Sequence, residues 1–387
     1  AMEPMNCVVR FDGDGCEVWN GEQFQTVDQA AIAASFKLAP EKVIIHQLYA
    51  GGSFGRRANA MSDYVLEAVA IAKAAHDQGH KVPVKMVWTR EDDMRAGYFR
   101  PMFVHRVSAA VDKSGAPLAW QQRIVGQSIM KGTPLEGFAI KDGIDFASVE
   151  GSAEAYPFAN VQIELHSPDT GVPVLWWRSV GHTHTAFVTE TMIDALAKSA
   201  GKDPFAFRRD LLGKHPRHLA ALELAAEKAG WSTPLKPGAK GEKRARGIAV
   251  HESFNSVVAQ VAEVTVQADG SLKVDRVVCA VHCGLAINPD VVRAQMEGGI
   301  GFGLAAALHG EVTLDKGAVQ QTNFHQYVPL RINEMPVVEV HIVPSADAPT
   351  GVGEPGVPPI APAVANAIFA ATGKAIRKLP IAAQLRA

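Results

Sequence analysis

A single acidic residue, Glu354, stands in the run GVGEPGVPP at residues 351–359, where every other residue is glycine, valine or proline. Glycine and proline cannot continue a helix or an interior strand, so this run predicts a fixed, irregular backbone with one carboxylate at its centre. A carboxyl group with few polar neighbours loses hydration, which raises its pKa toward the range of a general base. The alternative is an ordinary surface acid, and the residues alone leave both interpretations open.

A second segment, LYAGGSFGRR at residues 48–57, carries three glycines after a predicted strand. Successive glycines would let main-chain N–H groups approach an anion, and a helix that followed would add its positive end. The alternative is a tight turn with Phe54 buried in the core. It is not a Walker loop, because no GK[ST] follows.

A third segment, WWRSVGHTH at residues 176–184, combines an arginine with aromatic residues and two histidines. Arg178 could bind a phosphate or carboxylate, or it could stack on tryptophan. His182 and His184 raise the alternative of a zinc-dependent hydrolase. Histidines two residues apart at the start of a helix are more often cap and surface groups, and further candidate ligands are distant in the sequence.

The four cysteines, Cys7, Cys16, Cys279 and Cys283, form two loose pairs without CxxC spacing, so we expect free or structural thiols. A metal bound around His282 is disfavoured, because VVCAVHC alternates like a strand and would place neighbouring ligands on opposite faces. A disulfide between Cys7 and Cys16 stays open, since it depends on the redox compartment.

The composition is that of an ordinary globular protein. The 387 residues are 47% hydrophobic and carry a formal net charge of −2, so they can bury a large core and give no electrostatic argument for binding nucleic acid. No uninterrupted run of about 18 apolar residues predicts a membrane-spanning helix.

The elements that must position these residues are strands and helices without strict βαβ alternation, which predicts the α+β class. Strands are expected at 17–21, 41–50, 81–90, 161–168 and 337–345, and hairpins at 103–128 and 257–281 with turns at Lys113–Gly115 and Asp269–Gly270. Helices are expected at 62–79 with Ser62 as N-cap, within 185–230, at 289–310 and at 361–373. The polar, basic stretch 232–247 is predicted to be a linker between a first region, 1–231, and a second region, 248–387.

Six ordered motifs together resemble the molybdenum hydroxylases of the xanthine oxidase family. They are GGSFGRR, WWRSVGHTHTAFVTETMIDALA, KDPFAFRRDLL, VVCAVHCGLAINPDVVRAQMEGGIGFGLAAALHGE, QTNFHQYVPLR and GVGEPGVPPIAPAVANAIFAATG. Within that family they resemble the large, beta subunit of isoquinoline 1-oxidoreductase and related membrane-associated bacterial aldehyde dehydrogenases. The resemblance covers nearly the whole chain.

This resemblance implies a molybdopterin cofactor in its cytosine dinucleotide form, with the molybdenum held by the pterin and by no protein side chain. It implies that Glu354 is the general base of a hydroxylation that takes its oxygen from water. Val180 stands where the family often has an aromatic residue. The residues implied to line the cofactor are Gly51, Gly52, Ser53, Phe54, Gly55, Arg178, Gly181 and Gly353.

The resemblance also implies a hetero-oligomer in which electrons pass to a small [2Fe-2S] subunit and on to an acceptor such as a cytochrome c. The family's MGQG motif is not found, and the chain opens directly on a predicted strand. We therefore expect a processed product, a split subunit or an engineered fragment that needs the N-terminal half of the large subunit as a separate chain. The expected substrate is a small aldehyde or N-heterocycle. A periplasmic or membrane-associated location is implied, with the cytoplasm as the alternative, and a non-catalytic assembly module is the alternative function.

Overall fold

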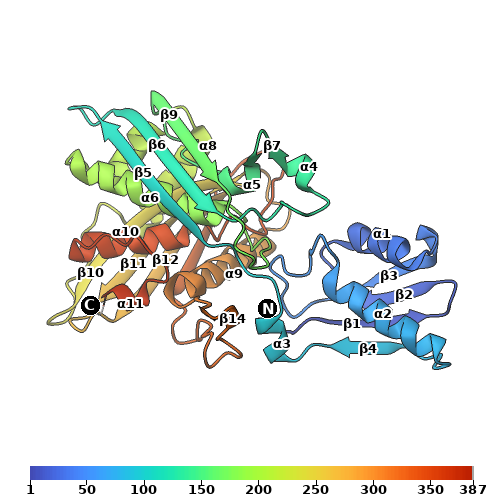
Figure 1. Cartoon of the computed structure of the whole chain (residues 1–387). Coiled ribbons are helices and arrows are strands. Elements are labelled where there is room, and N and C mark those ends of the chain that lie inside the picture. The colour runs from blue at the N-terminus through green and yellow to red at the C-terminus, as the bar shows by residue number, and fades with distance from the viewer. Residues whose placement is uncertain (386–387) are drawn as a thin grey trace.

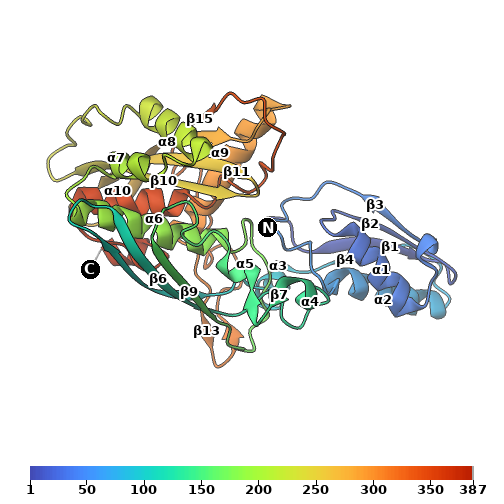
Figure 2. The ribbon, with the colours of Figure 1, turned by 90° about the horizontal axis from the view of Figure 1, so that it is seen from above.

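The computed structural model describes residues 1–385, which form a small N-terminal lobe and a larger lobe (Figures 1 and 2). In the small lobe, a four-stranded sheet has the order β3-β2-β1-β4, with β2 and β3 parallel and the other pairs antiparallel. Its strands are β1 (Asn6–Phe11), β2 (Cys16–Asn20), β3 (Val43–Gln47) and β4 (Val84–Val87). Its helices are α1 (Gln25–Phe36), the 3₁₀ turn η1 (Pro40–Lys42) and α2 (Asp63–Asp77).

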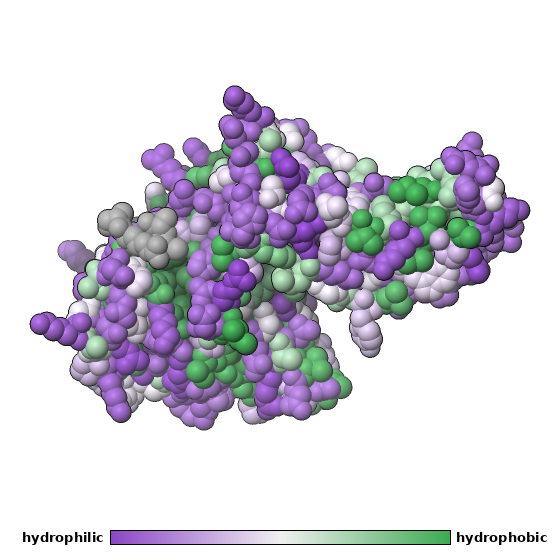
Figure 3. Space-filling model, turned by 90° about the horizontal axis from the view of Figure 1, so that it is seen from below, coloured by the Kyte–Doolittle hydropathy of each residue, from purple (hydrophilic) through white to green (hydrophobic). Residues whose placement is uncertain are grey.

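The two small-lobe helices cover one face of this sheet and leave the other face open (Figure 1). Along β1 the residues alternate between buried and more exposed, as expected for a sheet covered on one side. On the open side, Ile44 and Val87 are exposed. Figure 3 shows hydrophobic residues at the surface of both lobes. Ser62 occupies the N-cap position of α2, as predicted, but it has a positive φ of 52° and makes no side-chain capping hydrogen bond.

The larger lobe contains two main sheets. One has the order β5-β6-β9, and the other, β10-β11-β12-β15, pairs β12 with β15 in parallel. Their strands are β5 (Phe103–Val111), β6 (Pro117–Gly126), β9 (Asn160–His166), β10 (Lys243–Ser253), β11 (Ser256–Val266), β12 (Leu272–His282) and β15 (Val337–Ile342). Short strands complete the lobe: β7 (Ile140–Lys141), β8 (Ile144–Asp145), β13 (Leu314–Asp315) and β14 (Ala318–Val319).

Helices cover both faces of the sheet that contains β11. Helix α8 packs on β11 and β12, whereas α10 packs on β10 and β11 (Figure 2). Every residue of β11 is buried, as expected for a strand covered on both sides. The helices of this lobe, with α3 at its border, are α3 (Arg90–Arg95), α4 (Glu136–Ala139), α5 (Phe146–Val149), α6 (His182–Ser199), α7 (Pro204–Leu211), α8 (Pro216–Ala229), α9 (Pro289–Leu308), α10 (Ile360–Thr372) and α11 (Ala382–Leu385).

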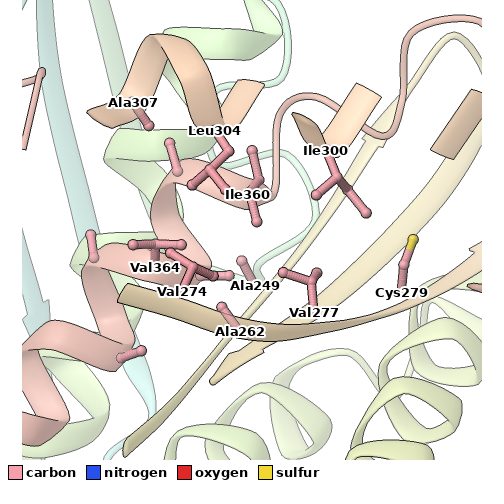
Figure 4. Packing of buried hydrophobic residues seen from close by; sticks show 14 of the residues in the cluster. Ala249, Ala262, Val274, Val277, Cys279, Ile300, Leu304, Ala307, Ile360 and Val364 are labelled. Atoms are coloured by element: carbon pink, nitrogen blue, oxygen red, sulfur yellow. The ribbon is translucent and has the colours of Figure 1, made fainter. Parts of the chain in front are cut away.

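The core between α9, α10 and the sheet consists of small and branched apolar side chains. Ile300 and Leu304 of α9 lie with Ile360 and Val364 of α10 above Val277 of β12 (Figure 4). All five are fully or almost fully buried. This packing holds together α9 and the chain entering α10, the two elements that flank Glu354.

Mixed sheets and helices confirm the predicted α+β class. The division of the chain at 232–247 stays a prediction, but two observations bear on it. Residues 243–247 belong to β10 and pair with β11. One hydrophobic cluster also joins Trp120 and Leu222 to Val257 and Val278, across the expected boundary. Within residues 1–385, every helix is too short or too polar to serve as a membrane span.

Candidate active site

The glycine loop, residues 51–55, follows β3 and lies where the two lobes meet. Positive φ angles of 96° at Gly52 and 104° at Gly55 turn the chain in a way that favours glycine. The N–H groups of Gly52, Ser53 and Phe54 donate to no acceptor within residues 1–385. Helix α2 starts only at residue 63, so the expectation that a helix adds its positive end at this loop is wrong.

Phe54 joins the glycine loop to the larger lobe through an aromatic stack. Its ring lies 4.4 Å from the ring of Phe302 on α9, which lies 4.5 Å from the ring of Trp177. Phe54 is half-buried, so it is not a plug of the core. A Cβ on Gly55 would lie 2.8 Å from the carbonyl oxygen of Trp176, so the close approach of the two segments requires glycine there.

The segment 176–181 connects the glycine loop to the loop that carries Glu354. The Arg178 N–H donates to the Phe54 carbonyl oxygen (3.1 Å), and its side-chain Nε donates to the Gly353 carbonyl oxygen (2.7 Å). Arg178 Nη2 also donates to Gln295 Oε1 of α9 (2.9 Å). The segment 176–181 therefore contacts both of the other glycine-containing segments singled out in the sequence.

Ser179 holds Glu354 by two hydrogen bonds. The Ser179 N–H donates to Glu354 Oε1 (2.8 Å), and the Ser179 hydroxyl donates to the Glu354 carbonyl oxygen (2.7 Å). Ser179 and the following Val180 both have positive φ angles, 79° and 46°, which cost about 1–3 kcal/mol each for residues other than glycine. Such strain persists where the surroundings fix the backbone, and here it directs a main-chain donor at a carboxylate.

The loop after Glu354 packs directly on α9. A Cβ on Gly303 would lie 2.7 Å from Ile360, and one on Gly356 would lie 3.2 Å from Met296, so these glycines allow close packing. Gln260 of β11 fixes the loop from below by donating from Nε2 to the Gly356 carbonyl oxygen (2.8 Å). The rigid mount predicted from GVGEPGVPP is thus present, and its rigidity comes from α9 and β11 as well as from proline.

Burial raises the pKa of Glu354 above its ordinary value, which agrees with the first of the two interpretations that the sequence left open. The hydrogen bond from the Ser179 N–H and the positive charge of Arg178 oppose this rise, because both stabilise the ionised carboxylate. The carboxyl group is half-buried. Glu354 is therefore a stronger base than an ordinary glutamate, and its carboxyl group can still ionise.

A second carboxyl group, Glu150 at the end of α5, was not singled out in the sequence. Burial raises its pKa to about 7, with a smaller contribution from the charge of Glu354 and against the hydrogen bond from the Gly181 N–H. Glu150 Oε1 accepts the Gly181 N–H (2.9 Å), and its Oε2 lies 3.5 Å from His182 Nε2. The neighbouring residues in DFASVEGS do not predict a site at Glu150, because the residues that bury this side chain are distant in the sequence.

Gly181 and the two histidines play local roles. A Cβ on Gly181 would lie 2.0 Å from the Ala147 carbonyl oxygen, so glycine lets the start of α6 pack on α5. His182 Nδ1 pairs with His251 Nε2 (2.8 Å), whereas His184 Nδ1 pairs with His105 Nε2 (3.0 Å). The described part of the chain has no group of three His, Cys, Asp or Glu residues arranged to hold a metal ion.

All four cysteines are buried free thiols in this structure. Burial raises the pKa of Cys7, Cys16 and Cys279 to about 12, so these thiols are unreactive.

Two sequence models of the molybdopterin cofactor-binding domain match the chain, one over residues 1–212 and the other over residues 206–336. The chain belongs to the molybdopterin cofactor-binding domain family. The prediction from the ordered motifs, part of the large subunit of a xanthine oxidase family molybdenum hydroxylase, is confirmed.

Curated relatives match almost the whole of this family member. It is 35% identical to the isoquinoline 1-oxidoreductase subunit beta of Brevundimonas diminuta, over 98% of this chain and 48% of that protein. It is 31% identical to the membrane-bound aldehyde dehydrogenase (pyrroloquinoline-quinone) of Gluconacetobacter polyoxogenes, over 98% of this chain and 51% of that protein. The chain therefore spans about half the length of these relatives.

The fold is that of known molybdenum enzymes. The crystal structure of quinoline 2-oxidoreductase from Pseudomonas putida 86 superposes with a TM-score of 0.83 at 15% identity, covering 98% of this chain and 73% of that chain.

The site has features that fit a cofactor bound through main-chain groups. Three successive N–H groups of the glycine loop are free to donate to an anionic or pterin-like group. Gly353 is exposed and a Cβ on it would meet no atom within 4 Å, so the backbone there is open to close approach. Among the described residues, Gly52, Ser53, Phe54 and Gly353 could hold such a group.

Proposed function

We propose that this chain supplies the general base and part of the molybdopterin site of a molybdenum hydroxylase, which oxidises an aldehyde or N-heteroaromatic compound with water as the oxygen source. The observation that carries the proposal is the position of Glu354, whose carboxylate accepts the Ser179 N–H next to Arg178, the residue that bonds the glycine loop. Support for the substrate class comes from the names of the relatives, an isoquinoline oxidoreductase and an aldehyde dehydrogenase.

The glycine loop and Gly353 would hold the molybdopterin. Main-chain donors at Gly52, Ser53 and Phe54 suit its polar groups, and Gly353 leaves space for it. When bound, molybdopterin supplies a redox-active metal that takes up the two electrons of the oxidation. Arg178 keeps this arrangement together by bonding both the glycine loop and the Glu354 loop.

Glu354 would act by taking a proton during the reaction. Its Oε1 is occupied by the Ser179 N–H, whereas its Oε2 has no hydrogen-bond partner within residues 1–385 and is free to accept a proton. Burial raises its pKa and increases its strength as a base, while the donor and Arg178 keep enough of it ionised to act. The packing on α9 holds the carboxylate in place, which matters because small misplacements cost large factors in rate.

We further propose a hetero-oligomer with the cytosine dinucleotide form of the cofactor. Its other members would be the N-terminal half of the large subunit, a small [2Fe-2S] subunit and a cytochrome c acceptor. The length of the relatives, about twice that of this chain, and the name of one of them as a subunit support the missing half. The name of the membrane-bound relative supports a periplasmic or membrane-associated location.

Metal analysis of the purified complex tests the proposal. Molybdenum, at close to one atom per copy of this chain, is the expected result, together with a copurifying polypeptide that carries an MGQG segment. Zinc in place of molybdenum would indicate the hydrolase alternative. The absence of both metals would indicate a non-catalytic assembly module.

A further inference from the structure

A cavity of about 680 Å³ lies in the larger lobe, between β5, the segment 176–181, the start of α6 and residues 377–379. This volume suits a small organic ligand. The cavity lies against the same segment that holds Glu354, but Glu354 itself is not part of its wall. Trp177 and Val180 face the cavity, whereas Arg178 and Ser179 bond the Glu354 loop.

The wall of this cavity contains positive charge without negative charge. Arg100, Arg106, Arg377 and Lys378 line it, and no aspartate or glutamate of the described chain does. The side chains of all four are exposed, so each can reach a ligand that enters the cavity from solvent. Positive charge with no carboxylate in the wall favours the binding of an anion.

Arg100 contacts the segment 176–181 through Trp177. Its guanidinium lies 4.6 Å from the centre of the Trp177 ring and makes no hydrogen bond or ion pair with any residue of 1–385. Its N–H groups are thus available to a ligand that enters the cavity.

A chain of polar side chains adds one more unused donor to the wall. The Trp120 Nε1–H donates to Gln122 Oε1 (2.9 Å), which leaves the Gln122 Nε2–H to donate to His105 Nδ1 (3.0 Å). His105 Nε2 then carries a hydrogen and donates to His184 Nδ1 (3.0 Å). It follows that His184 carries its own hydrogen on Nε2, which is buried and has no partner.

The rest of the wall is apolar and partly aromatic, with Phe103, Trp176 and Phe187 among its residues. Aromatic walls suit a planar ring. We propose that this cavity binds a planar, mainly apolar molecule with one carboxylate-like anionic group, and that Arg100 binds that group. That this molecule is the substrate of the enzyme rests on the function proposed above. That the cavity binds it does not rest on that function.

Benzoate and benzamide are a matched pair of probes, since they differ in charge and share the ring. Titration of the purified chain by calorimetry is expected to show one saturable site for benzoate, with benzamide at least about tenfold weaker, because hydrogen bonds to a charged group are worth about tenfold or more in affinity. Arg100→Met should weaken benzoate by a similar factor. Arg377→Met should weaken it less, since we assign the carboxylate to Arg100, and Arg123→Met is the control, because Arg123 pairs with Glu164 outside the cavity.

Equal affinity for benzoate and benzamide, or no binding of benzoate, would overturn the proposal. This comparison uses the unmodified protein, so it does not depend on whether the variants fold. Benzoate binding that Arg123→Met weakens as much as Arg100→Met would also overturn it. If inorganic phosphate binds as tightly as benzoate, the cavity is a phosphate site, and the proposal of an aromatic ligand is overturned. Glu354→Gln is expected to leave benzoate binding unchanged, so failure of the catalytic proposal and failure of this one are separable.

Discussion

Replacement of Glu150 by glutamine should stabilise the protein at high pH and leave it unchanged at low pH. Burial raises the pKa of this carboxyl group to about 7, from an ordinary value of 4.5. Its side chain is only 23% exposed, so screening by water is limited. Glutamine keeps an oxygen that accepts the Gly181 N–H, but it cannot ionise.

The sign and size of the effect follow from linkage. Below pH 4.5 the carboxyl is protonated in both the folded and the unfolded chain, so it causes no difference. As the pH rises toward 7, the unfolded chain loses this proton first, so the free energy of unfolding falls until both states are ionised. A rise from 4.5 to about 7, at 1.36 kcal/mol per pKa unit, corresponds to about 3 kcal/mol.

Urea unfolding at pH values from 4 to 8 measures this effect. The difference in unfolding free energy between Glu150→Gln and the unmodified chain should grow by about 3 kcal/mol over that range, in favour of the variant. Glu223→Gln, at an exposed position on α8, is the control and should leave the pH dependence unchanged. A Glu150→Gln variant with the same pH dependence as the unmodified chain would refute the reasoning.

Three other substitutions test the packing around the site. Gly353→Ala should change the unfolding free energy by less than about 1 kcal/mol, because its Cβ meets no atom, yet lower the molybdopterin content of the complex; unchanged content would remove Gly353 from the cofactor site. Gly55→Ala should destabilise the chain by more than about 1 kcal/mol in urea unfolding, because of its φ of 104° and the Trp176 carbonyl oxygen 2.8 Å away; a neutral effect would contradict this contact. Arg208→Met should lower the unfolding free energy by about 3–5 kcal/mol, because it leaves Glu190 buried and unpaired, and a loss below 1 kcal/mol would contradict that role.

Elements fixed by local patterns could be predicted from the sequence. The hairpin of β11 and β12 turns at Asp269–Gly270, and α9 begins at Pro289, because turn and cap chemistry involve only neighbouring residues. The division of the chain at 232–247 stays a prediction, although residues 243–247 belong to β10. There Arg246 pairs with Glu263 of β11, a partner that only the folded sheet brings near.

The residues of the site also differ in how far the sequence alone could predict them. The environment of Glu354 could be predicted because its own flanks exclude polar side chains. Glu150 could not, because the groups around it, the Gly181 N–H and His182, come from a segment about 30 residues away. The strained backbone at Ser179 could not be predicted either, since positive φ at a serine depends on the contacts that enforce it.

The most direct test of the account is the turnover of the Glu354→Gln variant in the molybdenum-loaded complex. Glutamine keeps the size of the side chain and an oxygen for the Ser179 N–H, so the fold and the molybdenum content should survive. It cannot accept a proton, so kcat and kcat/KM should fall together by about 10²–10⁴-fold. A variant with full molybdenum content and a near-normal kcat would contradict the assignment of Glu354 as the general base.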